Sequence, residues 1–521
     1  MTPDCGLAGR PPGALRFLFR PNPIVNVNAS IRLFALGFAL AAGAHAAPAG
    51  SDAPRPNILL AIGDNWAWPH ASVLGDPTVK TPVFDRVARE GLLFDNAFCP
   101  VPSCSPTRSS LVTGRVAHQL GEAASLWSVF RKFDAFTEML AASGYEVGFT
   151  GKGWSPGKYL EYGWTQNPAG KQYASFEEFM ATRDQAKPFF FWHGNVDVAL
   201  GKWKYGPEAW GGMNPDSVVV PPNLPDTREV RESILAYYGG VQRQDAVFGE
   251  AVARLESDGL LDDTLVIYTS DNGWQMPRGL ANCHDTGTRI PLAMRWGKRL
   301  EAGRRVADFI SLTDFAPTFL ELAGLPVPEA MTGRAFVDVM TGKPSAVPRD
   351  HVFLERERHA NVRKGDLSYP IRALRTRDFL YLWNLRPDRW PAGDPKAWMS
   401  VGNFGDVDGS WAKEFILDHR DDPDIRPFHE LNFGKRPGEE LYDLRKDPNQ
   451  LNNVANDPAY AEVRRDLRAR VETWMRETGD PRVDPAYDEW DKFPYFGGSV
   501  VDEHGNLKPR RLPWADRLNA P

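Results

Sequence analysis

The residues best suited to chemistry in this chain of 521 residues lie in the stretch SCSPTRSSLVTGR, residues 103–115. Pro106 fits the first turn of a helix, where its missing N–H is not needed, and Gly114 suits the position just after a helix end. We therefore expect Cys104 at a helix N-terminus, where the dipole favours negative charge and free N–H groups can bind an anion. Arg108 falls on the same helix face. A tetrahedral oxyanion such as sulfate or phosphate suits this arrangement; the alternative is a buried structural cysteine beside a surface arginine.

Two pairs of oxygen-donor residues form a second chemically capable group. Asp64-Asn65 and Asp271-Asn272 each come directly after an apolar run. Carboxylate and amide oxygens are the ligands that hard cations such as calcium or magnesium prefer. A divalent cation beside the helix N-terminus would polarise both a nucleophile and a bound anion. Four ligands with only two carboxylates fit calcium, with an anionic substrate completing its shell.

Four apolar runs predict the strands that must position these residues. They cover residues 57–63, 145–151, 188–194 and 264–270. Such runs are typical of parallel sheets whose strands are buried on both faces. Helical patterns lie between them, at 83–90 and at 231–255, where Gly239-Gly240 could break the helix. This alternation predicts a doubly wound α/β sheet.

Polar residues follow each predicted strand, at the sheet edge where ligands bind in such folds. They are Asp64-Asn65, Lys152, Asn195 with Asp197, and Asp271-Asn272. We expect these scattered residues to converge on one site.

The pattern changes after residue 345. Residues 367–385 read as two antiparallel strands, 438–456 as a strand and a turn, and 458–478 as a helix. The predicted organisation is therefore a catalytic domain, a smaller α+β subdomain with an antiparallel sheet and a closing helix, and a tail. Their ranges are 55–345, 346–500 and 501–521.

The N-terminal region has the features of an export signal. Residues 31–46 are an apolar run ending in Ala44-His45-Ala46, a small-x-small cleavage pattern, and arginines flank the run. We predict a signal peptide with a long n-region over residues 1–46, and an exported protein, periplasmic or extracellular. The run is short for a bilayer and no later stretch reaches about 20 apolar residues, so we expect no membrane span.

Composition excludes some classes of protein. The chain is 42% hydrophobic and 25% charged, an ordinary globular balance, and its formal charge of -6 without a basic stripe argues against a nucleic-acid partner. Of the four cysteines, only Cys99, Cys104 and Cys283 follow the predicted signal. This odd, sparse set does not make a disulfide framework, so one cysteine is expected to have a separate role.

The stretch CSPTR followed by SSLVTGR resembles the signature of type I sulfatases, C-x-P-[SAT]-R-x4-TG. Seven further stretches, from RPNILLAIGDN to ELYDLRKDPNQLNNVA, match that family in the same order over about residues 55–480. Within the family the chain most resembles the heparan N-sulfatase branch, through SCSPTR, MPRGLAN and SYPIRALRTRDFLYLWNL. The resemblance implies a large mixed sheet sandwiched by helices, as in alkaline phosphatases, with a smaller C-terminal α+β domain.

The resemblance also implies roles for individual residues. In this family a formylglycine-generating enzyme oxidises the signature cysteine, here Cys104, to formylglycine. One hydroxyl of its hydrate attacks sulfur, and after the alcohol or amine leaves, the other collapses to expel sulfate. Arg108 would hold the hydrate, and Lys152 would bind the hydrate and the sulfate. One calcium ion would be bound by Asp64, Asn65, Asp271, Asn272 and the modified Cys104.

Three positions depart from the family pattern. Asn65 replaces the second aspartate of the usual Asp-Asp, so weaker metal binding is expected. Ala199 stands where the family has a histidine for the leaving group, and Leu280 where it has a sulfate-binding Lys or Arg. Loss of a general acid, or of a cation that stabilises charge in the transition state, typically lowers the rate by about 10²–10⁴-fold. Four residues nearby in sequence could compensate for these losses: His193, Lys202, Arg278 and His284. Arg278 could reach the same anion, whereas His193 is more typical of a core histidine. His284, together with Arg289, could instead line the pocket.

We therefore expect a sulfatase that releases an N- or O-sulfate from a glucosamine-type residue of a sulfated saccharide. Arg358 and His359 precede the second-domain strands and could contact the sugar, although solvated charge runs are the commoner fate of such segments. Two alternatives stay open. One is a catalytically weakened sulfatase-fold protein that binds sulfated glycans; the other is a phosphate or phosphonate ester hydrolase on the same scaffold.

Overall fold

The computed structural model describes residues 55–345, 347–396, 402–497, 499–501 and 507–509. All of them belong to one compact unit. The predicted signal peptide, residues 1–46, lies outside the described residues, as does most of the predicted tail. Among the described residues, no helix is both long enough and apolar enough to cross a bilayer.

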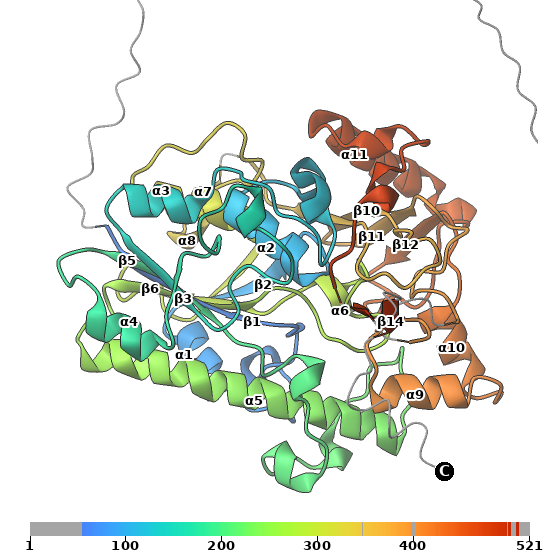
Figure 1. Cartoon of the computed structure of the whole chain (residues 1–521). Helices are drawn as coiled ribbons and strands as arrows, with labels where there is room; N and C mark the ends of the chain where they lie inside the picture. Colours follow the sequence, from blue (N-terminus) through green and yellow to red (C-terminus); the bar gives the residue numbers. More distant parts are fainter. Residues whose placement is uncertain (1–54, 346, 397–401, 498, 502–506, 510–521) are drawn as a thin grey trace, which may run out of the picture. The chain divides into compact units, whose positions relative to one another are not determined.

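An eight-stranded mixed sheet forms the larger layer of the fold (Figure 1). Its strand order is β4-β3-β5-β1-β6-β7-β2-β8, and β7 runs antiparallel to both of its neighbours while the other pairs are parallel. The strands are β1 (Asn57–Gly63), β2 (Leu92–Phe98), β3 (Glu146–Thr150), β4 (Lys171–Gln172), β5 (Phe189–Gly194), β6 (Thr264–Ser270), β7 (Leu292–Arg295) and β8 (Arg304–Ser311). The four predicted runs are β3, β5, β1 and β6, adjacent in the sheet, and the predicted α/β class is confirmed.

Helices cover both faces of this sheet (Figure 1). One apolar core joins it to α1 (Pro82–Arg89), α4 (Phe176–Thr182) and α5 (Arg228–Ser257). A second core on the opposite face joins it to α2 (Cys104–Thr113), α3 (Phe136–Ala142), α7 (Phe315–Leu322) and α8 (Val337–Met340). Strand side chains alternate between the two cores, as Leu59 and Ile58 do, because successive residues of a strand point to opposite faces.

Helix α5 runs without a break through Gly239-Gly240, unlike the interruption that these glycines suggested. A Cβ on Gly240 would lie 2.5 Å from the carbonyl oxygen of Asp197, and one on Gly239 would lie 2.7 Å from that of Ala209. The two glycines therefore let the loop after β5 pack directly on the helix backbone.

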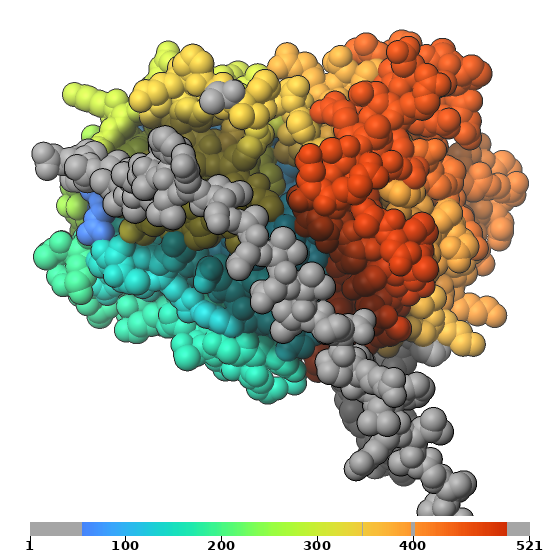
Figure 2. Space-filling view, turned by 90° about the horizontal axis from the view of Figure 1, so that it is seen from above, coloured from blue at the N-terminus to red at the C-terminus, as the bar shows by residue number. Residues whose placement is uncertain are grey.

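A four-stranded antiparallel sheet, in the order β12-β11-β10-β9, forms a smaller second layer. Its strands are β9 (His351–Arg356), β10 (Ile371–Thr376), β11 (Phe379–Asn384) and β12 (Glu439–Asp443). One face packs on α11 (Ala461–Glu477) through Leu467 and Val471. The other face packs with Phe98 of β2 and Phe309 of β8. These C-terminal residues form one continuous block in Figure 2, coloured orange and red.

The remaining elements are short. They are α6 (Asp285–Thr288), α9 (Trp411–Asp418), α10 (Arg426–Phe433), β13 (Ser499–Val501), β14 (Leu507–Pro509), and 3₁₀ turns at Ser72–Leu74, Ala117–Ala124, Leu160–Tyr162, Leu200–Lys202, Pro207–Trp210, Pro215–Ser217, Leu312–Asp314, Pro458–Tyr460, Pro481–Val483 and Glu489–Lys492. Strands β10, β11 and β12 and helix α11 lie where the sequence pattern predicts them. The domain boundary at residue 345 stays a prediction.

Candidate active site

Cys104 is the first residue of α2, with Ser103 as its N-cap. Gly114 ends the helix in the left-handed conformation with φ 64°, which glycine adopts without strain. Every residue of α2 is buried, and Cys104 itself is 8% exposed. The hydroxyls of Ser109 and Thr113 donate to backbone carbonyls one turn earlier, whereas those of Ser105 and Ser110 are buried without a hydrogen-bond partner among the described residues. The predicted helix N-terminus at Cys104 is confirmed.

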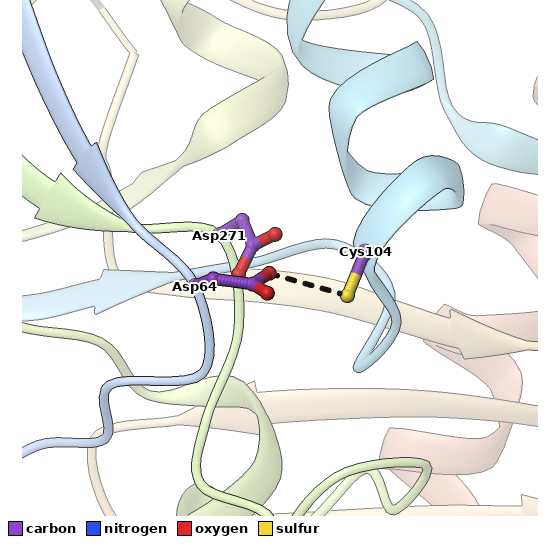
Figure 3. Close-up of side chains that lie close together, drawn as sticks. All are labelled: Asp64, Cys104 and Asp271. Carbon is purple, nitrogen blue, oxygen red and sulfur yellow. Dashed lines mark hydrogen bonds between the residues drawn. The ribbon is translucent and has the colours of Figure 1, made fainter. Parts of the chain in front are cut away.

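The residues that follow β1 and β6 meet at Cys104 (Figure 3). The Cys104 Sγ lies 3.4 Å from Asp64 Oδ1, 4.0 Å from Asn65 Oδ1 and 3.6 Å from Asn272 Nδ2. Asp64, Cys104 and Asp271 each offer one ligand atom, and these three atoms lie within 4.8 Å of one another. The structure thus brings together all five residues predicted to bind a metal; we call them the Cys104 cluster.

Two cations face the carboxylates of this cluster. Lys152 Nζ, after β3, lies 2.5 Å from Asp64 Oδ1 and 4.0 Å from Asp271 Oδ2. Arg108 Nε donates to Asp271 Oδ2 at 2.8 Å, and its Nη1 donates to the carbonyls of Lys152 and Gly153. The Arg108 guanidinium also lies over the Trp192 ring, 5.6 Å from its centroid. Arg108 therefore fixes the backbone that presents Lys152.

Burial and charge set the protonation of the cluster. Burial alone would raise the pKa of Asp64, but Lys152 and Arg108 outweigh it and lower that pKa below its ordinary value. Burial raises the pKa of Asp271 to about 6, against the opposing effect of Arg108. Burial, reinforced by Asp64, raises the pKa of the Cys104 thiol. An unmodified Cys104 is therefore a protonated thiol and a poor nucleophile at neutral pH.

The donor set fits a hard divalent cation. Asn272 donates from Nδ2 to Asp271 Oδ1 at 2.8 Å, while its Oδ1 is buried and has no hydrogen-bond partner among the described residues, which is costly for a polar atom unless a ligand satisfies it. Asp64 and Asp271 add carboxylate oxygens at the same place. Oxygen ligands of this kind suit calcium or magnesium better than a soft metal.

Asn195 and Asp197 do not join the cluster. Asn195 Nδ2 donates to Asp197 Oδ2 at 2.9 Å, and Asp197 lies 3.9 Å from Arg243 Nε of α5. These two polar residues instead stabilise the loop after β5, contrary to the expected convergence of every strand end.

The two arginines predicted to bind substrate contact other parts of the chain. Arg278 Nη2 donates to Tyr442 and to the Gln450 carbonyl and lies 2.9 Å from His284 Nε2. Arg358 donates to the carbonyls of Asp366, Phe493 and Pro494. Both side chains are buried in these contacts, and substrate binding by either stays a prediction.

His359 lies next to the cluster. Its Nδ1 is 2.8 Å from the Oγ of Ser103, the residue before Cys104. Burial lowers the pKa of His359 to about 4, Asp406 opposes this, and the positive charges of Arg356, Arg363 and Lys152 lower it further. His359 is therefore neutral at pH 7, with Nε2 as its remaining ring nitrogen.

The positions that depart from the expected pattern have clear surroundings. Ala199 is half-buried and starts the 3₁₀ turn at Leu200–Lys202, whereas Leu280 is buried. Of the candidate substitutes, His193 packs against the ring of Phe248, Lys202 is exposed and His284 faces Tyr442. Arg289, expected in the pocket wall, lies over Trp68. No contact joins these four side chains to the Cys104 cluster in the described part of the chain.

Sequence reasoning missed Gln275 and Asp408. Gln275 Oε1 accepts from Asn65 Nδ2 at 3.0 Å, and its Nε2 donates to Asp408. Gln275 could have been suspected because it lies four residues after Asp271. Asp408 comes from a loop before α9 and no local pattern marks it.

Two protein-family models and several known proteins match this chain. The family model described as Sulfatase matches residues 56–159 and 161–325. A second, described as N-sulphoglucosamine sulphohydrolase, C-terminal, matches residues 280–391. The chain is 28% identical to human N-sulphoglucosamine sulphohydrolase, over 82% of this chain and 91% of that protein.

Two further known proteins resemble this chain, one in sequence and one in fold. The chain is 24% identical to an ulvan-active sulfatase of Formosa agariphila, over 82% of this chain and 76% of that protein. The fold matches a solved structure of a protein in complex with its substrate D-glucosamine-2-N,6-O-disulfate, with a TM-score of 0.55 at 18% identity, over 83% of this chain and 99% of the other.

Proposed function

This chain belongs to the sulfatase family and is a sulfuric ester hydrolase, and from that premise we propose that it releases sulfate from a sulfated saccharide by way of a formylglycine made from Cys104. The observation that carries the proposal is the Cys104 cluster itself. Cys104 sits at a helix N-terminus, flanked by Asp64 and Asn272 and faced by two cations. Burial and the neighbouring Asp64 raise the pKa of the Cys104 thiol, which disfavours a thiolate nucleophile and is compatible with the proposed oxidation of this side chain.

Calcium is the second part of the proposal. Its ligands would be Asp64, Asn65, Asp271, Asn272 and the modified residue 104. When bound there, a calcium ion would polarise the sulfate and the attacking hydroxyl of residue 104.

The chain's own cations complete the site. Lys152 would bind one sulfate oxygen and stabilise the charge that develops as the sulfate is released. Arg108 would hold Asp271 and the Lys152 backbone in place, because it donates to both. Arg108 is therefore assigned mainly to positioning, and Lys152 to contact with substrate.

The substrate class is proposed as a glucosamine-type residue carrying an N- or O-sulfate at a chain end. Two relatives support it: the human relative is named for N-sulphoglucosamine, and a structure of the same fold holds a disulfated glucosamine. We propose that His359 contacts the sugar, because its Nδ1 lies 2.8 Å from the Oγ of Ser103, the residue before Cys104.

The proposal also includes maturation and location. A formylglycine-generating enzyme would act on Cys104, and the chain would be exported through the signal predicted at residues 1–46. Both elements rest on the amino-acid sequence, since the signal lies outside the described residues.

The test combines mass spectrometry with sulfate release. Protein from its native host should carry residue 104 about 18 Da lighter than cysteine, because one oxygen replaces sulfur with loss of two hydrogens. Modified protein should release sulfate from N-sulfated or 6-O-sulfated glucosamine, and Cys104→Ala should not.

Two results would contradict the proposed function. If modified protein releases no sulfate from N-, 6-O- or 2-O-sulfated sugars yet binds them, the weakened-binder alternative replaces this proposal. If the protein releases phosphate from phosphate monoesters in preference to sulfate, the alternative of a phosphate or phosphonate ester hydrolase would be favoured.

A further inference from the structure

Asn65 poses a problem that an aspartate would not. A carboxylate presents an oxygen to a cation in either orientation, whereas an amide presents an oxygen in one orientation and an NH₂ group in the other. In the structure Asn65 Oδ1 faces Cys104, at 4.0 Å from Sγ, and its Nδ2 points away. Something must hold this orientation.

We propose that Gln275 is a positioning residue that fixes the Asn65 amide with its oxygen toward the metal position, and that Leu200 and Asp408 fix Gln275 in turn. The inference rests on the metal site of the proposed function and goes beyond it, because it assigns a role to residues outside the ligand set.

The first contact fixes Asn65. Gln275 Oε1 accepts a hydrogen bond from Asn65 Nδ2 at 3.0 Å. If the Asn65 amide rotated by half a turn, its own oxygen would face Gln275 Oε1, two acceptors would meet, and the hydrogen bond would be lost. Gln275 therefore favours one orientation of Asn65 only while its own oxygen stays in place.

Two further contacts fix Gln275. The backbone N–H of Leu200 donates to Gln275 Oε1 at 2.5 Å, and because an N–H can only donate, the atom facing it must be an oxygen. On the other side Gln275 Nε2 donates to the carboxylate of Asp408. Rotating the Gln275 amide would break both contacts at once.

The four residues joined by these hydrogen bonds come from distant parts of the sequence. Asn65 follows β1, Gln275 follows β6, Leu200 lies after β5, and Asp408 precedes α9 in the C-terminal half. Residues in such an outer shell typically change metal affinity by about 10–100-fold when they are removed. They act by orienting the ligand, without touching the metal.

The test is a double-substitution cycle read by calcium calorimetry on protein whose residue 104 has the same, mass-verified state throughout. Gln275→Met keeps the side-chain length and removes the polar atoms, so it should weaken calcium binding about 10–100-fold. In the Asn65→Asp background the same substitution should weaken binding less than about threefold, or strengthen it, because a carboxylate at position 65 needs no orientation and would face the oxygen of Gln275.

Two controls separate orientation from folding. Gln242→Met removes another glutamine, on α5, that accepts from a backbone N–H, that of Lys80, and should leave calcium affinity unchanged. The paired exchange Gln275→Glu with Asp408→Asn keeps an acceptor toward Asn65 and Leu200 and a donor–acceptor pair at position 408. It should retain calcium affinity within about threefold of the parent.

The outcomes distinguish the inference from the proposed function. Equal loss from Gln275→Met in both backgrounds, or no loss with Asn65 present, overturns the positioning role while leaving the metal site intact. If the parent protein binds no calcium, or binds it equally well after Asp271→Asn, the metal site of the proposed function fails and the positioning role fails with it.

Discussion

Arg108 and Asp271 form a fully buried ion pair, with Nε 2.8 Å from Oδ2 and neither side chain exposed. The same guanidinium donates to the carbonyls of Lys152 and Gly153. One planar group from α2 thus links the end of β6 to the end of β3. A lysine has no such fork of donors and cannot make these contacts together.

Arg108→Lys should therefore lower kcat for sulfate release by about 10²–10³-fold, because Lys152 loses its backbone support and Asp271 its fixed partner. Steady-state sulfate release measures the effect. Arg86→Lys is the matched control: Arg86 pairs with Glu90 and Glu256 at the surface, where such pairs contribute little. A rate for Arg108→Lys equal to that of the control would remove Arg108 from the site.

Restoring the missing histidine is a gain-of-function test. Ala199 is half-buried and lies one residue before Leu200, whose N–H contacts Gln275. Ala199→His should fold normally and raise kcat about tenfold or more, because a proton donor for the leaving group is regained. The measurement is kcat on N- and O-sulfated glucosamine.

Leu280→Arg is the informative contrast, because Leu280 is only 4% exposed. An unpaired guanidinium there is costly, so this variant should lose stability in urea titration without a gain in rate. Both expectations would be contradicted if Leu280→Arg had a higher kcat than the parent and normal stability, while Ala199→His left kcat unchanged.

Gly240 should not tolerate a side chain even though it lies in a helix. Alanine is favoured over glycine in helices by about 1 kcal/mol, yet a Cβ here would lie 2.5 Å from the Asp197 carbonyl oxygen. We expect Gly240→Ala to lower the free energy of unfolding by about 1–3 kcal/mol. In Gly249→Ala on the same helix the new Cβ meets only the Val83 side chain, which can move, so the net change should be smaller or stabilising. Urea unfolding of the two variants decides the matter.

His193 should make the protein sensitive to acid. Burial lowers the pKa of His193 to about 4 from an ordinary 6.5. Because the unfolded chain then binds the proton more readily, the stability that neutral His193 contributes is complete above pH 6.5 and is lost as the pH falls toward 4. Between about pH 7 and pH 5 this contribution should fall by roughly 2 kcal/mol.

His193→Leu should remove that part of the pH dependence in urea titrations at the two pH values. Phe248→Leu serves as the control, since it disturbs the same aromatic contact without removing a titrating group. If both variants keep the parent's pH dependence, the ring of His193 does not titrate as described.

The strands and the nucleophile helix were predictable because their signals are local. Asn57–Gly63 and Thr264–Ser270 are apolar runs bounded by polar residues, and the structure has strands at those same positions. The meeting of Asp64 and Asp271 followed from the rule that the carboxyl ends of parallel strands share one edge, whereas their place beside Cys104 was implied by the family resemblance.

The failures were tertiary. The sequence left a helix break at Gly239-Gly240 open, because the close approach of the loop after β5 cannot be seen in the helix sequence. Asp408 bonds to Gln275 from 133 residues away, and no spacing marks such a pair. Substrate binding by Arg278 is not among these failures and stays a prediction; its backbone has φ 65° and its guanidinium faces Tyr442.

The burial of α2 has a consequence for the timing of maturation. All ten residues from Cys104 to Thr113 are buried in the folded protein. A modifying enzyme therefore cannot bind this segment after the domain has folded. If Cys104 is oxidised as proposed, the segment must be recognised as an extended peptide while the chain is still open. Folding and modification then compete, and a molecule that folds first is trapped with an inert thiol. The yield of active enzyme would depend on the order of these two events as much as on the chemistry of the site.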